Sequence, residues 1–378
     1  MLMRVARLAR LDLNRLAAAQ ARLGEAVVDP GQWVSLMEAI CAAIGAHGAG
    51  LLRGEDRTPD VPVTASAAEM FRTYFANNLH LGDVRAAKGL PLIVSGQAVV
   101  RDQDMFSSES AMMHDPLYAH LAKFSLRWFA GVSFRSGPTV WAVSLQRTVT
   151  QGMFGDEEMR ALATLSKPLT DVSTLSRLAG QQVLRGTLNA FEMINEPAIA
   201  MTESGIVLEA NAQATRLFDD EFRVSFGRLF IRDGEASAEL QLLLNGYPRE
   251  GELRPRSMNP SGNVVVVRRQ FRRPILVRPL PVYGPARSPF LGARFILILR
   301  DMEATRLPPV EVIAKAFSLS SAEAKVASMV AAGLSPEEIA DALDLSRETV
   351  RNQIKAVFGK ANVHRQNELA ALMARIAP

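Results

Sequence analysis

Apolar residues recur every three or four positions along several parts of the chain, which is the spacing of one helix face. This spacing predicts helices over residues 1–27, 31–46 and 66–78. Short apolar runs at 48–53 and 94–100 are typical of strands instead. Two runs between 127 and 147 alternate apolar and polar residues around Ser136-Gly137-Pro138, which predicts a β-hairpin. Helices mixed with strands in this way predict an α+β unit.

A long helical pattern follows the hairpin, from about residue 154 to residue 194. Pro168 lies inside the pattern and predicts a kink. The apolar positions recur at three- and four-residue steps, at Leu162, Leu165, Leu169, Val172, Leu175, Ala179 and Val183. Such a segment is a linker helix, a seam for a partner, or a helix packed on its own domain, and the sequence leaves these alternatives open.

A second α+β pattern covers residues 195–305. Two strands around a turn at Glu203-Ser204-Gly205 come first, two helices follow, and three strands end the block. This order, together with the sequence GIVLEAN (Gly205–Asn211), resembles the PAS domain, an antiparallel sheet with helices on one face. The earlier block, residues 28–153, resembles a GAF-type sensor domain in its pattern of elements.

Four helices with clear boundaries are predicted from residue 320 onward. A serine followed three residues later by a glutamate has the spacing of a capping box, which satisfies free amides at a helix start. This spacing occurs twice, at Ser320/Glu323 and at Ser335/Glu338. Ser346 is a third N-cap, and Gly333 and Asn362 follow helix ends, where a left-handed residue closes the last turn.

The second and third of these helices are separated by a tight turn, which predicts a helix-turn-helix. The residues expected inside its core are Ile339, Ala340, Leu343, Leu345, Val350, Ile354 and Val357. The residues expected to point outward from the third helix are Arg347, Arg351, Asn352, Gln353 and Lys355. Cations and amides of this kind suit phosphates and base edges. Charge is polarised as well, because residues 347–378 contain six basic and two acidic residues whereas 319–346 contain one lysine and five acids.

The stretch from Leu319 to Leu372 resembles the LuxR-type (GerE-type) helix-turn-helix of bacterial transcription regulators. The residues that carry the resemblance are Leu319, Glu323, Val326, Gly333-Leu334-Ser335, Ile339-Ala340, Leu343, Ser346, Thr349-Val350, Ile354, Lys360, Val363 and Arg365. The resemblance implies that Arg351, Asn352 and Lys355 meet bases or phosphates in the major groove of double-stranded DNA. It also implies that the fourth helix forms a dimer contact, and that the DNA backbone is held by Ser346, Thr349, Lys360 and Arg365.

Four positions depart from the family pattern. The family often has glutamate where Lys325 stands, histidine at Gln353, leucine at Ala361 and glycine at Asn362. The first two departures affect a surface contact or a phosphate contact. None of them conflicts with the predicted fold.

Composition narrows the class of protein. The chain has 378 residues, 48% of them apolar and 22% charged, which is ordinary for globular domains. A single cysteine, Cys41, excludes a disulfide framework and a cysteine-based zinc site, and fits a reducing cytoplasm. Arginines interrupt the apolar start of the chain, so it does not resemble a signal peptide, and no run reaches the ~18 apolar residues of a membrane helix. We expect a cytoplasmic protein without membrane contact.

Motifs for catalysis are absent from the sequence. It contains no phosphate-binding GxxxxGK[ST] loop, no HExxH and no GxSxG. We therefore expect no enzyme activity, no cofactor and no bound metal. Residues 253–300 contain ten arginines and neither lysine nor acid, which indicates either an anion or partner site or a solvated outer face of a sheet.

A small-molecule pocket is the remaining candidate site. Large side chains gather in the first α+β block, at Met112, Tyr118, Trp128, Phe134 and Trp141. They line a ligand pocket or pack in the core, and both interpretations stay open.

The sequence therefore predicts a multidomain protein, in which α+β GAF-like and PAS-like sensor domains precede an all-α four-helix helix-turn-helix domain. The expected parts are an N-terminal helix (1–27), a GAF-like domain (28–153), a linker helix (154–194), a PAS-like domain (195–305) and a DNA-binding domain (313–378). The expected function is a homodimeric transcription regulator controlled by a small-molecule effector or partner. The rivals are a constitutive DNA-binding dimer with scaffold-only N-terminal domains and an enzyme-like ligand-processing protein with an accessory DNA head.

Overall fold

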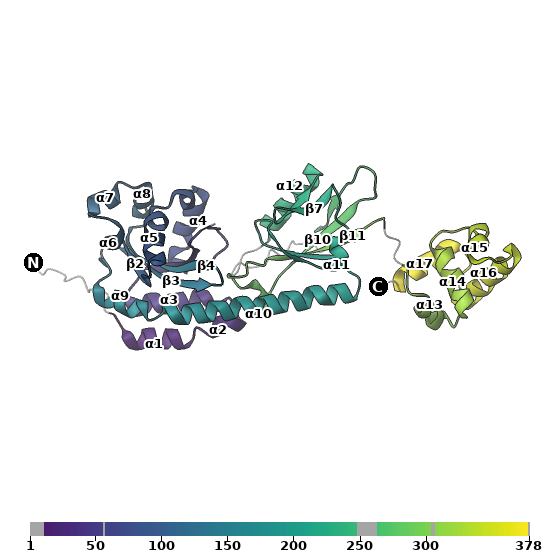
Figure 1. The fold of residues 1–378 in the computed structure, drawn as a ribbon, viewed down its shortest axis with the longest axis horizontal. Helices are drawn as coiled ribbons and strands as arrows, with labels where there is room; N and C mark the ends of the chain where they lie inside the picture. Colours follow the sequence, from purple (N-terminus) through teal and green to yellow (C-terminus); the bar gives the residue numbers. More distant parts are fainter. Residues whose placement is uncertain (1–10, 56, 248–262, 304–306, 377–378) are drawn as a thin grey trace, which may run out of the picture.

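The computed structural model describes residues 11–55, 57–247, 263–303 and 307–376. Figure 1 shows three units in chain order: an N-terminal unit (11–163), a middle unit (195–303) and a C-terminal helical unit (307–376). The long helix α10 (Ser166–Met193) runs along the first two units. No helix in the described part of the chain is long and apolar enough to cross a membrane.

The N-terminal unit is a four-stranded antiparallel sheet with the order β1-β4-β3-β2. Its strands are β1 (Gly48–Arg53), β2 (Val99–Arg101), β3 (Leu126–Ser136) and β4 (Thr139–Thr148). Its helices are α1 (Leu13–Ala21), α2 (Glu25–Val28), α3 (Gln32–Ile44), α4 (Ala68–Ala76), α5 (Val84–Val94), α6 (Asp102–Met105), α7 (Glu109–Met113), α8 (Pro116–Ala122) and α9 (Asp156–Ala163). Figure 1 shows α1, α3 and α10 below the sheet and α4, α5 and α8 above it. The predicted hairpin is confirmed as β3 and β4, with Ser136 paired to Thr139 and Gly137 at a φ of 60°.

Three predicted elements of this unit were wrong in their extent. The helix expected over 1–27 is two helices within its described residues, because the chain turns at residues 22–24. The strand expected over 94–100 begins only at Val99, since α5 continues through Pro91 to Val94. The pattern over 154–194 divides into α9 and α10, and Pro168 lies in the first turn of α10, where a missing amide hydrogen costs no helical bond.

Helix α10 contacts both α+β units along a stripe of leucine, serine and glycine residues. Its buried positions are Leu169, Ser173, Ser176, Gly180, Leu184 and Leu188, a stripe displaced from the apolar one that the sequence predicts. A Cβ atom on Gly180 would lie 2.7 Å from the carbonyl oxygen of Pro285, so this approach requires glycine. Leu175 and Leu178 remain 55% and 45% exposed.

The middle unit is a five-stranded antiparallel sheet with the order β6-β5-β11-β10-β9. Its strands are β5 (Ala198–Met201), β6 (Val207–Ala210), β9 (Val265–Val267), β10 (Ile275–Pro281) and β11 (Phe295–Asp301). Helices α11 (Ala212–Thr215) and α12 (Gly234–Asn245) begin after Asn211 and Asp233, whose carboxamide and carboxylate oxygens cap them. Five strands and both helices match the predicted order, whereas the hairpin of β7 (Phe222–Ser225) and β8 (Arg228–Ile231) was not expected.

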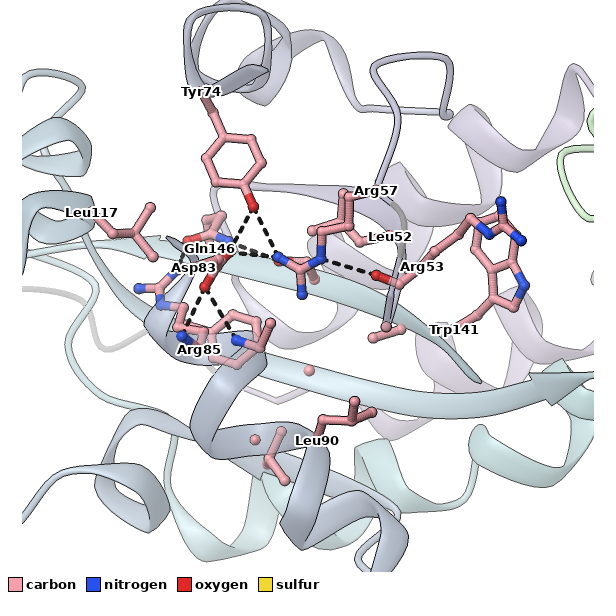
Figure 2. Close-up of a pocket in the computed structure, with 18 of the residues that line it drawn as sticks. Leu52, Arg53, Arg57, Tyr74, Asp83, Arg85, Leu90, Leu117, Trp141 and Gln146 are labelled. Carbon is pink, nitrogen blue, oxygen red and sulfur yellow. Dashed lines mark hydrogen bonds and ion pairs between the residues drawn. The ribbon is translucent and has the colours of Figure 1, made fainter. Parts of the chain in front are cut away.

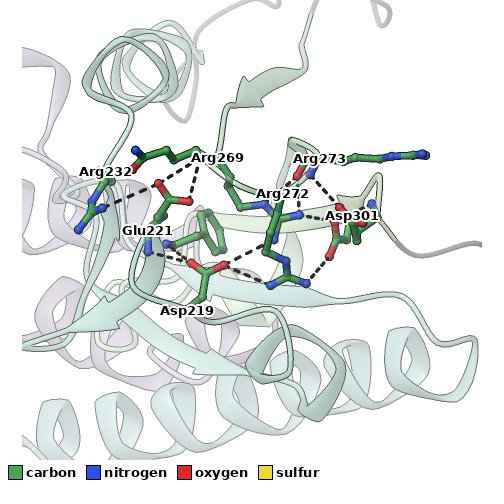
Figure 3. Close-up of polar contacts among 10 residues, drawn as sticks. Asp219, Glu221, Arg232, Arg269, Arg272, Arg273 and Asp301 are labelled. Carbon is green, nitrogen blue, oxygen red and sulfur yellow. Dashed lines mark hydrogen bonds and ion pairs between the residues drawn. The ribbon is translucent and has the colours of Figure 1, made fainter.

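Some arginines of the arginine-rich segment (253–300) form ion pairs with carboxylates instead of facing solvent. The Arg269 side chain is fully buried, 2.5 Å from Asp301 and 3.6 Å from Asp219. Arg272 lies 3.3 Å from Asp219 and 3.7 Å from Asp301, so two arginines share two carboxylates at the end of β11 (Figure 3). Arg254 and Arg256 lie outside the described residues.

An aromatic side chain of the middle unit inserts into the N-terminal unit. Phe290, on the segment before β11, is 8% exposed and belongs to the core of the N-terminal unit. Its ring meets those of Trp33, Phe134 and Trp141 edge-on, with centroids 5.2, 5.9 and 5.1 Å away. Next to it, Arg294 forms an ion pair and two hydrogen bonds with Asp60 of the N-terminal unit.

We expect Phe290→Ala to destabilise the chain by about 3–5 kcal/mol, because it leaves a cavity among three aromatic rings. Urea unfolding followed by tryptophan fluorescence measures this change, since Trp33 and Trp141 both contact Phe290. Phe271→Ala is the matched control, because that ring is 87% exposed and its loss should leave stability nearly unchanged. Equal effects of the two substitutions would contradict the inserted position of Phe290.

Candidate nucleic-acid interface

The C-terminal unit consists of five helices. They are α13 (Val310–Phe317), α14 (Ser321–Ala331), α15 (Pro336–Leu343), α16 (Arg347–Ala361) and α17 (Gln366–Ile376). The last four were predicted, three of them from their caps, and α13 adds the fully buried Ile313 to the core. Both predicted capping boxes are confirmed, at Ser320/Glu323 and Ser335/Glu338. Asn362 ends α16 with a φ of 53° and a ψ of 46°, as its place after the last turn predicts.

A tight turn connects α15 to α16. Asp344 adopts the left-handed conformation, with a φ of 52°, and ends α15. Two residues later, the Ser346 hydroxyl accepts a hydrogen bond from the amide of Thr349 and lies 2.8 Å from the Thr349 hydroxyl oxygen. These local bonds fix where α16 begins, and therefore which of its side chains face outward.

The inner side of α16 packs in the core of this unit. Val350 and Val357 are buried together with Ile339 and Ala340 of α15. Leu345 was expected in the core but is 38% exposed, because it lies in the turn between the two helices.

The opposite side of α16 is exposed and cationic. Its exposed residues include Arg347, Arg351, Asn352 and Lys355, which recur at helical spacing along one face. One acid, Glu348, lies among them. The Arg351 guanidinium is 3.5 Å from Glu337 and 69% exposed, so this ion pair is weak. Three cations and one amide on a protruding helix match the donors that read base edges and phosphates.

Gln353 and Lys360 differ from the other candidate DNA contacts in their surroundings. Gln353 is half-buried, and its Oε1 atom has no hydrogen-bond partner in the described part of the chain. The Lys360 ammonium lies 2.7 and 2.9 Å from the two carboxylate oxygens of Glu323, so it ties α16 to the start of α14. Arg365 is exposed just before α17.

Glu323 is the electrostatic centre of this helix contact. Its carboxylate accepts hydrogen bonds from Lys360 and from the amide of Ser320, and these lower the pKa of Glu323 to about 2. The Glu323 side chain is 14% exposed. The capping box and the ion pair therefore share one ionised group.

The five residues predicted as a ligand pocket lie in different surroundings. Trp141 lines a cavity of the N-terminal unit, between the sheet and helices α4 and α5 (Figure 2). Tyr118 is buried and accepts a hydrogen bond from Arg85, which also lines that cavity. Phe134 packs on Phe290, whereas Met112 and Trp128 are buried in the core. Sequence spacing did not identify the polar residues Arg53, Arg57 and Asp83, which come together at the cavity only through the fold.

Comparison with known proteins identifies the C-terminal unit. Residues 317–373 match the GerE family, described as bacterial regulatory proteins, luxR family. This part of the chain is a luxR-family helix-turn-helix domain, which indicates DNA-binding transcriptional regulation. Regulators of this family are generally not enzymes.

Curated relatives match a limited part of the chain. The response regulator UvrY of Escherichia coli (strain K12) is 31% identical over 99 residues, and the UvrY protein of Shigella flexneri matches equally. Each alignment covers 26% of this chain, and the chain spans 45% of the length of these relatives.

Two solved structures have a weak likeness to the chain. The phage VqmA–DPO complex shows 16% sequence identity over 52% of this chain and 89% of that chain. The E. coli DhaR(N)–DhaL complex shows 15% identity over 75% of this chain and 87% of that chain. Both have a TM-score of 0.23, which is too low to establish a common fold.

We expect Arg351→Ala to lose about 1–3 kcal/mol of specific DNA-binding free energy, because its exposed guanidinium is suited to a base edge. Lys355→Ala should weaken binding to all sequences alike and reduce the salt slope by about one. Fluorescence anisotropy with a selected operator and a random duplex, at several salt concentrations, separates the two effects.

The matched control for this pair is Lys315→Ala, which removes an exposed cation from α13. It should leave operator affinity within the error of the measurement. An unchanged affinity of the double variant of Arg351 and Lys355 would refute the recognition face on α16.

The Glu323–Lys360 ion pair predicts a pH dependence. The folded pKa of Glu323, about 2, lies below its usual value of 4.5, so the pair stabilises the fold above pH 4.5 and is lost as the pH falls towards 2. Amide hydrogen exchange of α14 and α16 in the full chain should therefore show less protection in Glu323→Gln than in wild type at pH 6. The difference should vanish near pH 2.

Lys360→Gln should reproduce that loss, and the double variant should be less destabilised than the sum of the single variants. An additive double variant would show that the two groups do not interact.

Proposed function

We propose that the protein is a homodimeric transcription regulator that binds double-stranded DNA through α16. The observation that carries this proposal is the exposed face of Arg347, Arg351, Asn352 and Lys355, on a helix whose other face closes the core. The luxR-family match over 317–373 supports it independently. In this assignment Arg351, Asn352 and Lys355 enter the major groove, and Ser346, Thr349 and Arg365 hold the DNA backbone.

Lys360 has a structural role in this proposal. Its ammonium is held by Glu323, so contact with phosphate would need the ion pair to open. It therefore contributes to DNA binding mainly by fixing the angle between α14 and α16.

The N-terminal and middle units are the sensors in this proposal, GAF-like over 28–153 and PAS-like over 195–305. Antiparallel sheets covered by helices in both units support the assignment. A cavity at Trp141 in the N-terminal unit favours control by a small molecule over a scaffold-only role. Binding there changes DNA affinity only if the ligand prefers one arrangement of the dimer over another.

The dimer contact is assigned to α10 together with α17. Leu175, Leu178 and Met193 are exposed on the side of α10 that faces away from its buried stripe. Leu178 is 45% exposed and Met193 is 86% exposed, although both are apolar. A second copy of the chain would bury this side in a helix pair, and would place two copies of α16 at a fixed distance.

Selection of DNA sites from a random duplex pool tests the function. The full chain should select two related half-sites separated by about one helical turn, ~10 base pairs, as two-fold symmetry requires. Sedimentation should give a dimer at micromolar concentration. Leu178→Glu should shift the protein towards monomer and weaken binding to the paired site, because it places charge in the helix contact.

Leu242→Glu is the matched control, since Leu242 is equally apolar and 73% exposed on α12. It should leave both the dimer and the DNA affinity unchanged. A monomeric wild type, both free and bound to DNA, would overturn the dimer, and the absence of any enriched sequence would overturn the regulator.

A further inference from the structure

The cavity of the N-terminal unit is small and mostly apolar. It lies between the sheet and helices α4 and α5, and has a volume of about 50 Å³ (Figure 2). Apolar parts of its wall come from Leu52, Met70, Phe71, Leu117, Phe129 and Trp141. This volume is a third of the ~150 Å³ of an engineered apolar cavity that takes benzene. The space, called the inner cavity below, therefore suits an aliphatic group of a few carbons.

Two of the three arginines at the inner cavity already have a carboxylate. Arg57 donates to Asp83 at 2.5 Å, and Asp83 also accepts from the Tyr74 hydroxyl at 2.7 Å and from two backbone amides. Burial opposes ionisation of Asp83, but the charge of Arg57 and the Tyr74 hydrogen bond outweigh it and keep the pKa below its usual value. Arg85 is buried between two aromatic rings and lies 3.4 Å from Asp102.

Arg53 is the cation without such a partner. It ends β1, its guanidinium lies over the ring of Trp141 at 5.7 Å, and it borders the inner cavity. No ion pair of Arg53 is found within the described ranges, and its buried Nε atom has no hydrogen-bond acceptor there. A buried donor without an acceptor costs free energy, so this guanidinium has unused capacity for an anion.

Arg53 also lies where a ligand could enter the inner cavity from the protein surface. Arg53, Arg57 and Trp141 line a second, wider cleft of about 1360 Å³, between the N-terminal and middle units. Thr202, Ser204 and Gly292 of the middle unit form part of the other wall. An anion at Arg53 would therefore lie at the mouth of the inner cavity, with its apolar end directed inward.

We propose that the inner cavity binds a short-chain monocarboxylate, with its carboxylate against Arg53 and its aliphatic tail among the apolar residues below Trp141. The ligand needs a negative charge because Arg53 is a cation without an ion pair among the described residues. Its tail must be short because the inner cavity is small. The proposal deepens the proposed function, because it names the effector class for the N-terminal unit. The Trp141 ring also contacts Phe290 of the middle unit, with ring centroids 5.1 Å apart. A bound carboxylate would therefore contact a residue that packs against the middle unit.

Titration of the full chain with butyrate tests this site, with tryptophan fluorescence and thermal unfolding as readouts. Butyrate should raise the unfolding temperature and change the fluorescence in a saturable way. Butyramide, which has the same shape without the charge, should do neither at equal concentration. Inorganic phosphate, which has charge without a tail, should bind at least tenfold more weakly than butyrate.

Substitutions then locate the carboxylate. Arg53→Gln should raise the Kd for butyrate about ten- to hundredfold, as expected for loss of a charge-assisted hydrogen bond. Arg53→Lys should recover part of the affinity. Arg135→Gln is the matched control, because this exposed arginine lies on β3 of the same unit.

The outcomes separate this site from the proposed function. Equal butyrate binding by wild type and Arg53→Gln, equal binding of butyramide, or no saturable response to butyrate overturns the site. DNA affinity is measured in parallel: butyrate binding that leaves operator affinity unchanged supports the site and overturns its regulatory role. Failure of the wild type to bind any selected operator, both with and without butyrate, overturns the regulator instead.

Discussion

The insertion of Phe290 into the N-terminal core is the contact on which the arrangement of the two α+β units depends. A ring from the middle unit completes an aromatic cluster with Trp33, Phe134 and Trp141, so neither unit is closed without the other. Gly180 allows α10 to approach the middle unit closely, because the Cβ atom of any larger residue would clash with the carbonyl oxygen of Pro285. The two units therefore share a packed boundary, and α10 packs against both of them.

Strand β11 begins near this joint and ends at Asp301, before the C-terminal unit. It begins one residue after Arg294, which is paired with Asp60, and it ends at Asp301, which is paired with Arg269. Seven extended residues span roughly 20–25 Å at ~3.4 Å each. Charged contacts therefore lie at both ends of the strand, and Arg272 contacts both Asp219 and Asp301 at its C-terminal end.

What the sequence predicted well depends on local chemistry. Capping serines, the glutamates three residues later and Asn362 act within one helix turn, so their spacing located α14, α15 and α16 of the C-terminal unit. The contacts that it missed join distant residues: Phe290 with Trp33, Arg269 with Asp301, and Arg57 with Asp83. The strand expected over 94–100 failed for a related reason. Its apolar residues suit either a strand or the end of a helix, and the helix that begins at Val84 continues through them to Val94.

The charges of the C-terminal unit are divided unevenly between its helices. Acids are concentrated on α14 and α15, where Glu323 and Glu338 cap helix starts and Glu323 also binds Lys360. Among the described residues, the acids near the lysine and arginines on the outer face of α16 are Glu337, which lies 3.5 Å from Arg351, and the neighbouring Glu348. Glu323 and Glu338 are therefore engaged in contacts within the fold, whereas the cations on the outer face of α16 are exposed. In the proposed regulator, such a separation would turn the cationic face towards DNA and the acidic side away from it, so long-range electrostatics would favour one orientation.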